Sequence, residues 1–233
     1  MYVNSHFKVH PATSLAFAAA RGFGLVIAAD GGRPVASPLP FRLIEQDGKV
    51  PKLEFHVARA NPLGQIAEKG GTWLVAVHGP DAYVSPDWYA SADQVPTWLY
   101  ETVHLSGPVR VIDGDHTRGH TERLSATFEK WLAPKPQWQL DKVSDKRREM
   151  LLKAIVAVEM TIETIEGNFK LNQHKSDADH VAVALALSSQ DDPSAQAIAQ
   201  RMVALRPHLA YDQAVPSSPP EGMTASELAI AAK

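Results

Sequence analysis

The chain has 233 residues, 45% of them hydrophobic and 21% charged, which is the composition of a globular protein with a sizeable core. Its net charge of −3 and its pI of about 6.4 exclude a global positive field that would collect nucleic acid. The absence of cysteine excludes disulfides, thiolate metal ligands and a cysteine nucleophile. The apolar run 15–29 is interrupted by Arg21 and follows no basic segment, so it predicts neither a signal peptide nor a membrane span, and we expect a cytoplasmic protein.

The first part of the chain predicts strands joined by short turns. In chain order we expect a helix at 12–21, strands at 23–30, 33–46 and 49–58, a short helix at 61–70, and a strand at 72–79. The segment 33–46 is rich in proline, which removes backbone donors and therefore predicts an edge strand or a bent strand. Asp47-Gly48 predicts a hairpin turn between this strand and the next.

The second part of the chain is richer in helices. We expect a strand at 96–113, helices at 116–133 and after Ser144-Asp145, a β-hairpin at 158–173 turning at Glu166-Gly167, and helices at 178–188 and 194–205. Short links favour antiparallel pairing, and alternating βαβ units are absent. The prediction is an α+β, mainly β protein: a small antiparallel split barrel with inserted and C-terminal helices over 1–206, and a Pro/Ser-containing, partly ordered tail over 207–233.

Aromatic residues and prolines concentrate in the stretch 79–107, which holds five of the ten Trp and Tyr residues of the chain. Its prolines predict a rigid loop flanked by strands. Rings with hydroxyl and indole groups suit a planar, partly polar ligand. The same rings would equally serve to plug one end of a barrel.

The motif "HVARANP" at 56–62 places an arginine next to the start of a helix. Asn61 is the expected N-cap and Pro62 the first helical residue. A guanidinium fork beside free backbone N–H groups is a ready phosphate site. The alternative is that Arg59 pairs with a carboxylate while Asn61 only caps the helix.

Other polar clusters favour ordinary surface roles. His116 and His120 lie four apart on a predicted helix, but no third ligand can be assigned, so a solvated helix face is favoured over a metal site and no metal is predicted. The alternating polar residues Lys170 and Asn172 likewise favour a solvated strand face. No catalytic acid or base can be assigned from the sequence.

Several stretches together resemble one family, the PaiB-type FMN-binding negative transcriptional regulators. They are the opening "MYVNSHF", "HVARANP", "GPDAYVSPDWY", "VPTWLYETVH" and "IVAVEMTIETIEGNFKLNQ", and the match runs in order from Met1 to about Met202. The resemblance implies a split-barrel fold of the pyridoxamine-phosphate-oxidase and flavin-reductase kind. It also implies a homodimer with FMN in clefts at the interface.

The resemblance further implies where FMN is bound. The implied contacts lie on the strand before the hairpin (Ser37, Leu39), from the next strand to the helix start (His56, Arg59, Asn61), in the aromatic stretch (Ser85, Trp88, Tyr89, Thr97, Trp98) and near the C-terminal strand (Lys170, Gln173). Within this pattern Arg59 is the expected phosphate ligand. The chain departs from the family where Pro38 replaces a usual His and Leu99 a usual Asn, and each change deletes a hydrogen-bonding group.

Three functions are compatible with this sequence. The first is an FMN-binding regulator or sensor of flavin or redox state. The second is an FMN-dependent oxidoreductase of the flavin-reductase or pyridoxamine-phosphate-oxidase kind, and the third is a structural or interaction module without flavin. Direct DNA binding is implied only by the family name, because the sequence shows no recognition helix with a basic face.

Overall fold

The computed structural model describes residues 1–112 and 115–211. The chain divides into two compact units. We call residues 21–77 and 104–165 the barrel unit, and residues 1–20, 78–103 and 166–233 the helical unit.

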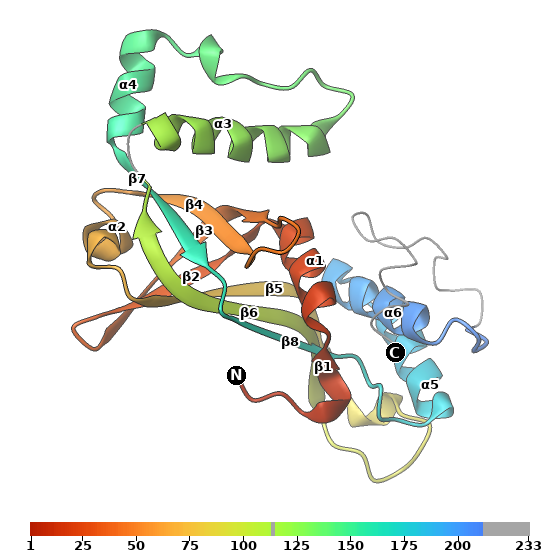
Figure 1. Cartoon of the computed structure of the whole chain (residues 1–233). Helices are drawn as coiled ribbons and strands as arrows, with labels where there is room; N and C mark the ends of the chain where they lie inside the picture. The colour runs from red at the N-terminus through yellow and green to blue at the C-terminus, as the bar shows by residue number, and fades with distance from the viewer. Residues whose placement is uncertain (113–114, 212–233) are drawn as a thin grey trace. The chain divides into compact units, whose positions relative to one another are not determined.

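The strands of the described residues form an eight-stranded sheet in the order β1-β8-β6-β5-β2-β3-β4-β7 (Figure 1). Strand β6 also pairs with β7, which closes six of the strands into a ring, and the pairings of known register are antiparallel. The predicted antiparallel split barrel is therefore confirmed. The bounds are β1 Lys8–Val9, β2 Phe23–Asp30, β3 Arg33–Ile44, β4 Lys52–Ala58, β5 Thr72–Val84, β6 Thr97–Val111, β7 Ile155–Thr161 and β8 Thr164–Lys170.

The core of the barrel unit follows from the alternation of side chains along its strands. On β4, Leu53, Phe55 and Val57 are all at most 2% exposed. The residues between them, Glu54 and His56, point to the opposite face, because successive side chains of a strand leave on opposite sides. Helix α3 (Asp115–Glu129) covers this outer face of β3, β4 and β7 (Figure 1). Polar groups of the strands are thereby enclosed between sheet and helix.

Strand β3 changes its partner half-way. Residues 33–40 pair with β2, and residues 41–44 pair with β4. The Phe41 N–H donates to Gly22 O on the β2 side at 2.8 Å, so the N–H positions of Pro34, Pro38 and Pro40 face away from β2. Residues 33–40 therefore pair on one side only, and we call them the half-open part of β3. The prolines lie where the strand needs no backbone N–H donor.

The helices lie close to their predicted positions. The barrel unit carries α2 (Pro62–Ile66), α3 and α4 (Asp145–Lys153), and the helical unit carries α1 (Pro11–Arg21), α5 (Asp177–Ser188) and α6 (Pro193–Leu205). Helix α4 ends earlier than its apolar pattern suggested, because the β-branched run from Ile155 onward starts β7. Of the predicted tail, residues 212–233 lie outside the described residues.

The predicted hairpin at 158–173 is wrong. Strand β7 pairs with β4 and β6, whereas β8 lies between β1 and β6, so the two consecutive strands are not partners. Gly167 is not a turn residue but lies within β8, opposite Val9. A Cβ at this position would lie 2.2 Å from Ser14 Oγ and 2.9 Å from Val9 Cβ. The glycine is needed for close packing in the helical unit.

The aromatic stretch is shorter as a loop than predicted. Strand β5 continues to Val84, beyond its predicted end at residue 79, so Tyr83 lies on a strand. Strand β6 begins at Thr97, close to the predicted start, and carries Trp98 and Tyr100. Only 85–96 is a loop, and it begins with a 3-10 turn at Pro86–Trp88. No helix within the described part of the chain is long and apolar enough to cross a membrane.

Candidate functional site

The start of α2 is tied to β3 by the side chain of Asn61. Its Oδ1 accepts a hydrogen bond from the Leu63 N–H at 2.9 Å and so caps the helix. Its Nδ2 donates to Ser37 Oγ at 2.8 Å. Because the Ser37 hydroxyl acts as acceptor here, its own proton remains available to a ligand. Leu39, two residues further along β3, leaves the strand on the same side as Ser37.

Arg59 is held at its base and exposed at its tip. Its backbone N–H donates to Ala154 O at 2.9 Å, and its Nε donates to Lys153 O at 2.8 Å. These carbonyls belong to the end of α4. The two terminal nitrogens of the guanidinium make no hydrogen bond or ion pair to any residue that the structure describes. Arg59 is thus not paired with a carboxylate there, and its charged end points into solvent.

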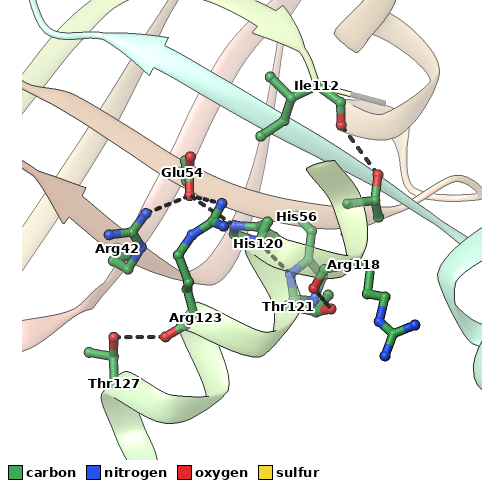
Figure 2. A network of polar contacts seen from close by, with 10 residues as sticks. Arg42, Glu54, His56, Ile112, Arg118, His120, Thr121, Arg123 and Thr127 are labelled. Carbon is green, nitrogen blue, oxygen red and sulfur yellow. Dashed lines mark hydrogen bonds and ion pairs between the residues drawn. The ribbon is translucent and has the colours of Figure 1, made fainter. Parts of the chain in front are cut away.

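His56 is part of a polar network under α3, which Figure 2 shows. Its Nδ1 lies 3.0 Å from Nε2 of His120, and His120 Nδ1 lies 3.5 Å from Glu54 Oε2. His120 is fully buried, so the prediction of a solvated helix face is wrong for this residue. It holds for His116, which is exposed. The error arose because helix periodicity alone does not show which strand side chains lie beneath the helix.

The network shifts the pKa values of Glu54 and His56. The hydrogen bond from His120, reinforced by Arg42, lowers the pKa of Glu54 to about 2. Burial, together with the neighbouring His120, lowers the pKa of His56 to about 4. A proton on His120 Nδ1 facing the Glu54 carboxylate leaves its Nε2 as the acceptor for the Nδ1–H of His56. His56 is then a neutral imidazole whose Nε2 is an acceptor.

A row of charges crosses the outer face of the barrel beside this network. Arg42 Nη2 donates to Glu54 Oε2 at 2.9 Å, and Arg110 Nε donates to Glu159 Oε1 at 2.8 Å. Arg42 faces Glu54 across β3 and β4, and Arg110 faces Glu159 across β6 and β7. Burial alone would raise the pKa of Glu159, but hydrogen bonds from Lys52 and Arg110 lower it. Sequence reasoning missed this row, although two polar residues spaced by two in an apolar strand, Glu54 and His56, were a usable signal.

In the helical unit, Lys170 and Thr97 come together. Lys170 Nζ donates to Thr97 Oγ1, and burial together with the nearby Lys175 lowers the pKa of Lys170. Gln173 is bonded to its own segment, since its Oε1 accepts from the Leu171 N–H at 2.8 Å and its Nε2 donates to Phe169 O. The hydrogen bonds of Gln173 therefore fix the conformation of the chain after β8. Of these two residues, Lys170 has the charged amine that could bind a ligand.

The aromatic residues predicted as ligands lie in two different environments. The buried Tyr89 donates its hydroxyl proton to Asn172 Oδ1 at 3.4 Å, and Lys175 Nζ lies 5.0 Å from its ring centroid. Ser85 caps the nearby 3-10 turn by accepting from the Asp87 N–H at 3.3 Å. Trp88 and Trp98 instead line an open hollow of about 350 Å³.

The two family departures lie in different environments. Leu99 is fully buried in the core of the helical unit, where an apolar side chain is at home. Pro38 is exposed on the half-open part of β3. An apolar residue at position 99 therefore suits its buried surroundings, and position 38 belongs to the surface.

Comparison with known proteins places these observations in a family. The family model described as "Putative FMN-binding domain" matches residues 1–164. The chain belongs to this FMN-binding family. A relative from Bacillus subtilis, "Protease synthase and sporulation protein PAI 2", is 32% identical over 203 residues, covering 87% of this chain and 96% of the relative. An uncharacterized protein of Saccharomyces cerevisiae is 36% identical over 84 residues, covering 34% of this chain and 50% of the relative.

The solved structures to which this chain is similar are less identical to it in sequence than these relatives are. The FAD- and heme-binding protein from Mycobacterium smegmatis has a TM-score of 0.49 at 20% identity, covering 68% of this chain and 69% of its own. Within the described residues, no group of three or more His, Asp or Glu side chains has the arrangement of a metal site.

Proposed function

We propose that this protein binds FMN and uses it in a regulatory role, as a flavin- or redox-linked regulator. Membership of the FMN-binding family supports the cofactor. The similarity to a Bacillus subtilis protein named for protease synthesis and sporulation supports regulation over metabolism. Bound FMN would supply reversible electron or hydride transfer, and the protein would supply binding and orientation. The observation that carries the proposal is the anchored but open guanidinium of Arg59.

The FMN phosphate needs a cation and paired donors to leave bulk water. Arg59 fits this need, because its Nε is fixed on Lys153 O while both terminal nitrogens remain available as a fork. The free proton of Ser37 fits as a second donor, held in place by Asn61. His56 is neutral at neutral pH and adds no positive charge. Arg59 is therefore the cation that we assign to the phosphate.

The remaining predicted ligands fit less charged parts of FMN. The His56 Nε2 acceptor suits a ribityl hydroxyl, and the half-buried Leu39 suits the edge of the ring. In the helical unit we propose Lys170 and Thr97 as ligand-contacting groups, with Lys170 as the second cationic candidate. Ser85, Tyr89 and Gln173 would act by holding the segments that carry them.

The test compares FMN with riboflavin, which lacks the phosphate. Each charge-assisted hydrogen bond contributes about 1.5–3 kcal/mol, so Arg59→Ala should weaken FMN binding by roughly ten- to a hundredfold and leave riboflavin nearly unchanged. Flavin fluorescence titrations measure both affinities. Arg33→Ala, which removes another exposed arginine of the barrel unit, is the matched control and should change neither.

Two outcomes would contradict the assignment of Arg59. Equal weakening of FMN and riboflavin would mean that Arg59 supports the fold, and Lys170→Ala would then be tested in the same way. Absence of flavin affinity in the unaltered protein would contradict the proposed function as a whole.

The assembly and location that we propose are those implied by the resemblance, a cytoplasmic homodimer with flavin clefts at its interface. The barrel unit exposes large apolar side chains of the kind that a partner covers, among them Phe23, Trp131, Leu132, Met150 and Leu151. Sedimentation at micromolar concentration should give a dimer, and a stable monomer would contradict this proposal.

The regulatory role that we propose does not depend on direct contact with DNA. With a net charge of −3, the chain should bind DNA weakly and with a steep loss of affinity as salt rises. A gel-shift titration at several salt concentrations measures this. Tight, sequence-specific binding at physiological salt would contradict the expectation and would make the protein a DNA-binding regulator in its own right.

A further inference from the structure

An open hollow of about 350 Å³ in the helical unit combines aromatic rings with carboxylates. Its aromatic residues are Tyr83, Trp88 and Trp98, and its charged residues are Asp81 and Asp192. The volume lies at the lower end of the range for small-molecule sites, about 300–1,000 Å³. Both charged residues are acidic, and no lysine or arginine of the described chain lines the hollow.

Two of the three rings are in contact with each other. Tyr83 and Trp98 meet edge to face, with centroids 6.0 Å apart and planes at 68°. Trp98 is 55% exposed, which is unusual for so large an apolar side chain. The faces of aromatic rings are negatively polarised and attract cations.

Within the described residues, the carboxylates of the hollow have no cationic partner. The Asp81 side chain makes no hydrogen bond or ion pair within the described residues. One oxygen of Asp192 accepts from the Ser194 N–H at 2.9 Å, as the N-cap of α6, and Asp192 forms no ion pair with any residue that the structure describes. The backbone of Asp81 is clamped by Ser194, whose Oγ accepts from Asp81 N at 2.9 Å and donates to Asp81 O at 2.7 Å. Two acidic side chains thus line the hollow, and the backbone that carries one of them is held in place.

The start of α6 does not turn the hollow into an anion site. A helix N-terminus attracts anions through its free N–H groups. Here Pro193 has no N–H, and the N–H of Ser194 is already taken by the Asp192 carboxylate. The charge balance of the hollow therefore favours a cation, whereas the FMN phosphate is an anion.

We propose that this hollow binds a small organic cation of the alkylammonium class. The rings of Tyr83, Trp88 and Trp98 contact the substituted nitrogen, and Asp81 and Asp192 balance its charge. This assigns Trp88 and Trp98 to a second ligand and not to the flavin. The proposal does not depend on FMN binding, and it gives a regulator an effector site separate from the cofactor.

Calorimetric titration of the full chain with choline tests the proposal. The matched control ligand is the neutral alcohol in which a tert-butyl group replaces the trimethylammonium group, so that shape is kept and charge is lost. Choline should bind with a Kd in the millimolar range or below, and the neutral alcohol should bind at least about tenfold more weakly. Equal binding of both ligands, or no choline binding, would overturn the proposal.

Variants locate the site. Trp98→Ala should weaken choline by roughly 3- to 30-fold, and the isosteric Asp81→Asn by roughly 3- to 10-fold. Tyr2→Ala, which removes an aromatic ring that is 86% exposed and does not line the hollow, should leave choline binding unchanged. If Trp98→Ala fails to fold, Asp81→Asn decides alone. If Trp98→Ala weakens FMN and riboflavin binding but leaves choline binding unchanged, the indole contacts the flavin, and the assignment is overturned.

Discussion

Glu54 and Glu159 face each other directly across β4 and β7, so two buried carboxylates lie side by side on the outer face of the barrel. Like charges in directly opposed positions destabilise a sheet. Here each carboxylate has its own cations: Arg42 on Glu54 at 2.9 Å, and Lys52 and Arg110 on the same oxygen of Glu159 at 2.9 and 2.8 Å. The pairing is tolerated because the cations belong to the adjacent strands.

Removing one of these cations should destabilise the barrel strongly. Arg42→Met leaves Glu54 with less compensation beside Glu159, and we expect a loss of about 2–4 kcal/mol in the free energy of unfolding. Urea unfolding measures it. The surface pair between Lys69 and Asp30 provides the control, since Lys69→Met should cost less than about 1 kcal/mol. If Arg42→Met costs no more than the control, the row is only a surface feature. Adding Glu54→Gln to Arg42→Met should recover part of the loss.

Stability should fall as the pH drops from about 6.5 to 4, because burial lowers the pKa of His56 to about 4. Between these pH values His56 is protonated in the unfolded chain but stays neutral in the folded chain, so acid favours unfolding. The contribution of His56 to the free energy of unfolding is fully present above pH 6.5. Its loss on going to pH 4 should be on the order of 2 kcal/mol. His56→Gln should flatten the curve of stability against pH. His174 and His180 also have lowered pKa values, so the difference between the two proteins is the quantity to measure, and parallel curves would contradict the prediction.

Gly167→Ala should destabilise the helical unit by about 1–3 kcal/mol. The new methyl group on β8 would clash with Ser14 Oγ of α1 and with Val9 of β1. Gly119 in α3 is the control, since its Cβ would meet only the flexible end of Arg123. Gly119→Ala should be neutral or stabilising by up to about 1 kcal/mol. Thermal unfolding of both variants measures the contrast. Adding Ser14→Ala to Gly167→Ala should restore part of the stability, and a turn at Gly167 would show no such rescue.

Asn61→Ala should cost about 1–2 kcal/mol, because it removes both the cap of α2 and the hydrogen bond to Ser37. Asn61→Asp separates the two contributions, since a carboxylate keeps the acceptor for the Leu63 N–H but has no donor for Ser37. We expect the Asp variant to retain most of the stability and to bind FMN more weakly than the parent. Chemical denaturation and flavin titration give the two readings. Equal stability of the Ala variant and the parent would contradict the capping role.

Most of the barrel was predictable from local patterns. The alternation along β2 and β4 and the Asp47-Gly48 turn identify antiparallel strands, and Asn61-Pro62 identifies the start of α2. These signals act within a few residues of one another, so sequence reasoning recovers them. Gly167 shows the limit. Glycine marks both tight turns and close packing, and only the position of Ser14, far away in the sequence, distinguishes the two.

The candidate site was predictable in part for the same reason. Asn61 caps α2 as the motif predicts, because a cap acts within a few residues, whereas the phosphate-binding role of Arg59 stays a prediction. The network of Glu54, His56 and His120 joins residues 64 to 66 positions apart in sequence, and no periodicity predicts which helix face covers which strand. The paired carboxylates Glu54 and Glu159 depend on strand register, which the sequence alone does not specify.

The three prolines on the half-open part of β3 also bear on how this protein behaves at high concentration. An unpaired strand edge is a template on which a second chain can add a strand, and such addition begins aggregation. With Pro34, Pro38 and Pro40 on the side away from β2, this edge presents carbonyl groups but none of the matching N–H donors at those positions. An incoming strand would find only half of the hydrogen bonds that a ladder needs. The prolines that make this segment unlike a regular strand in sequence thereby keep copies of the protein from joining edge to edge.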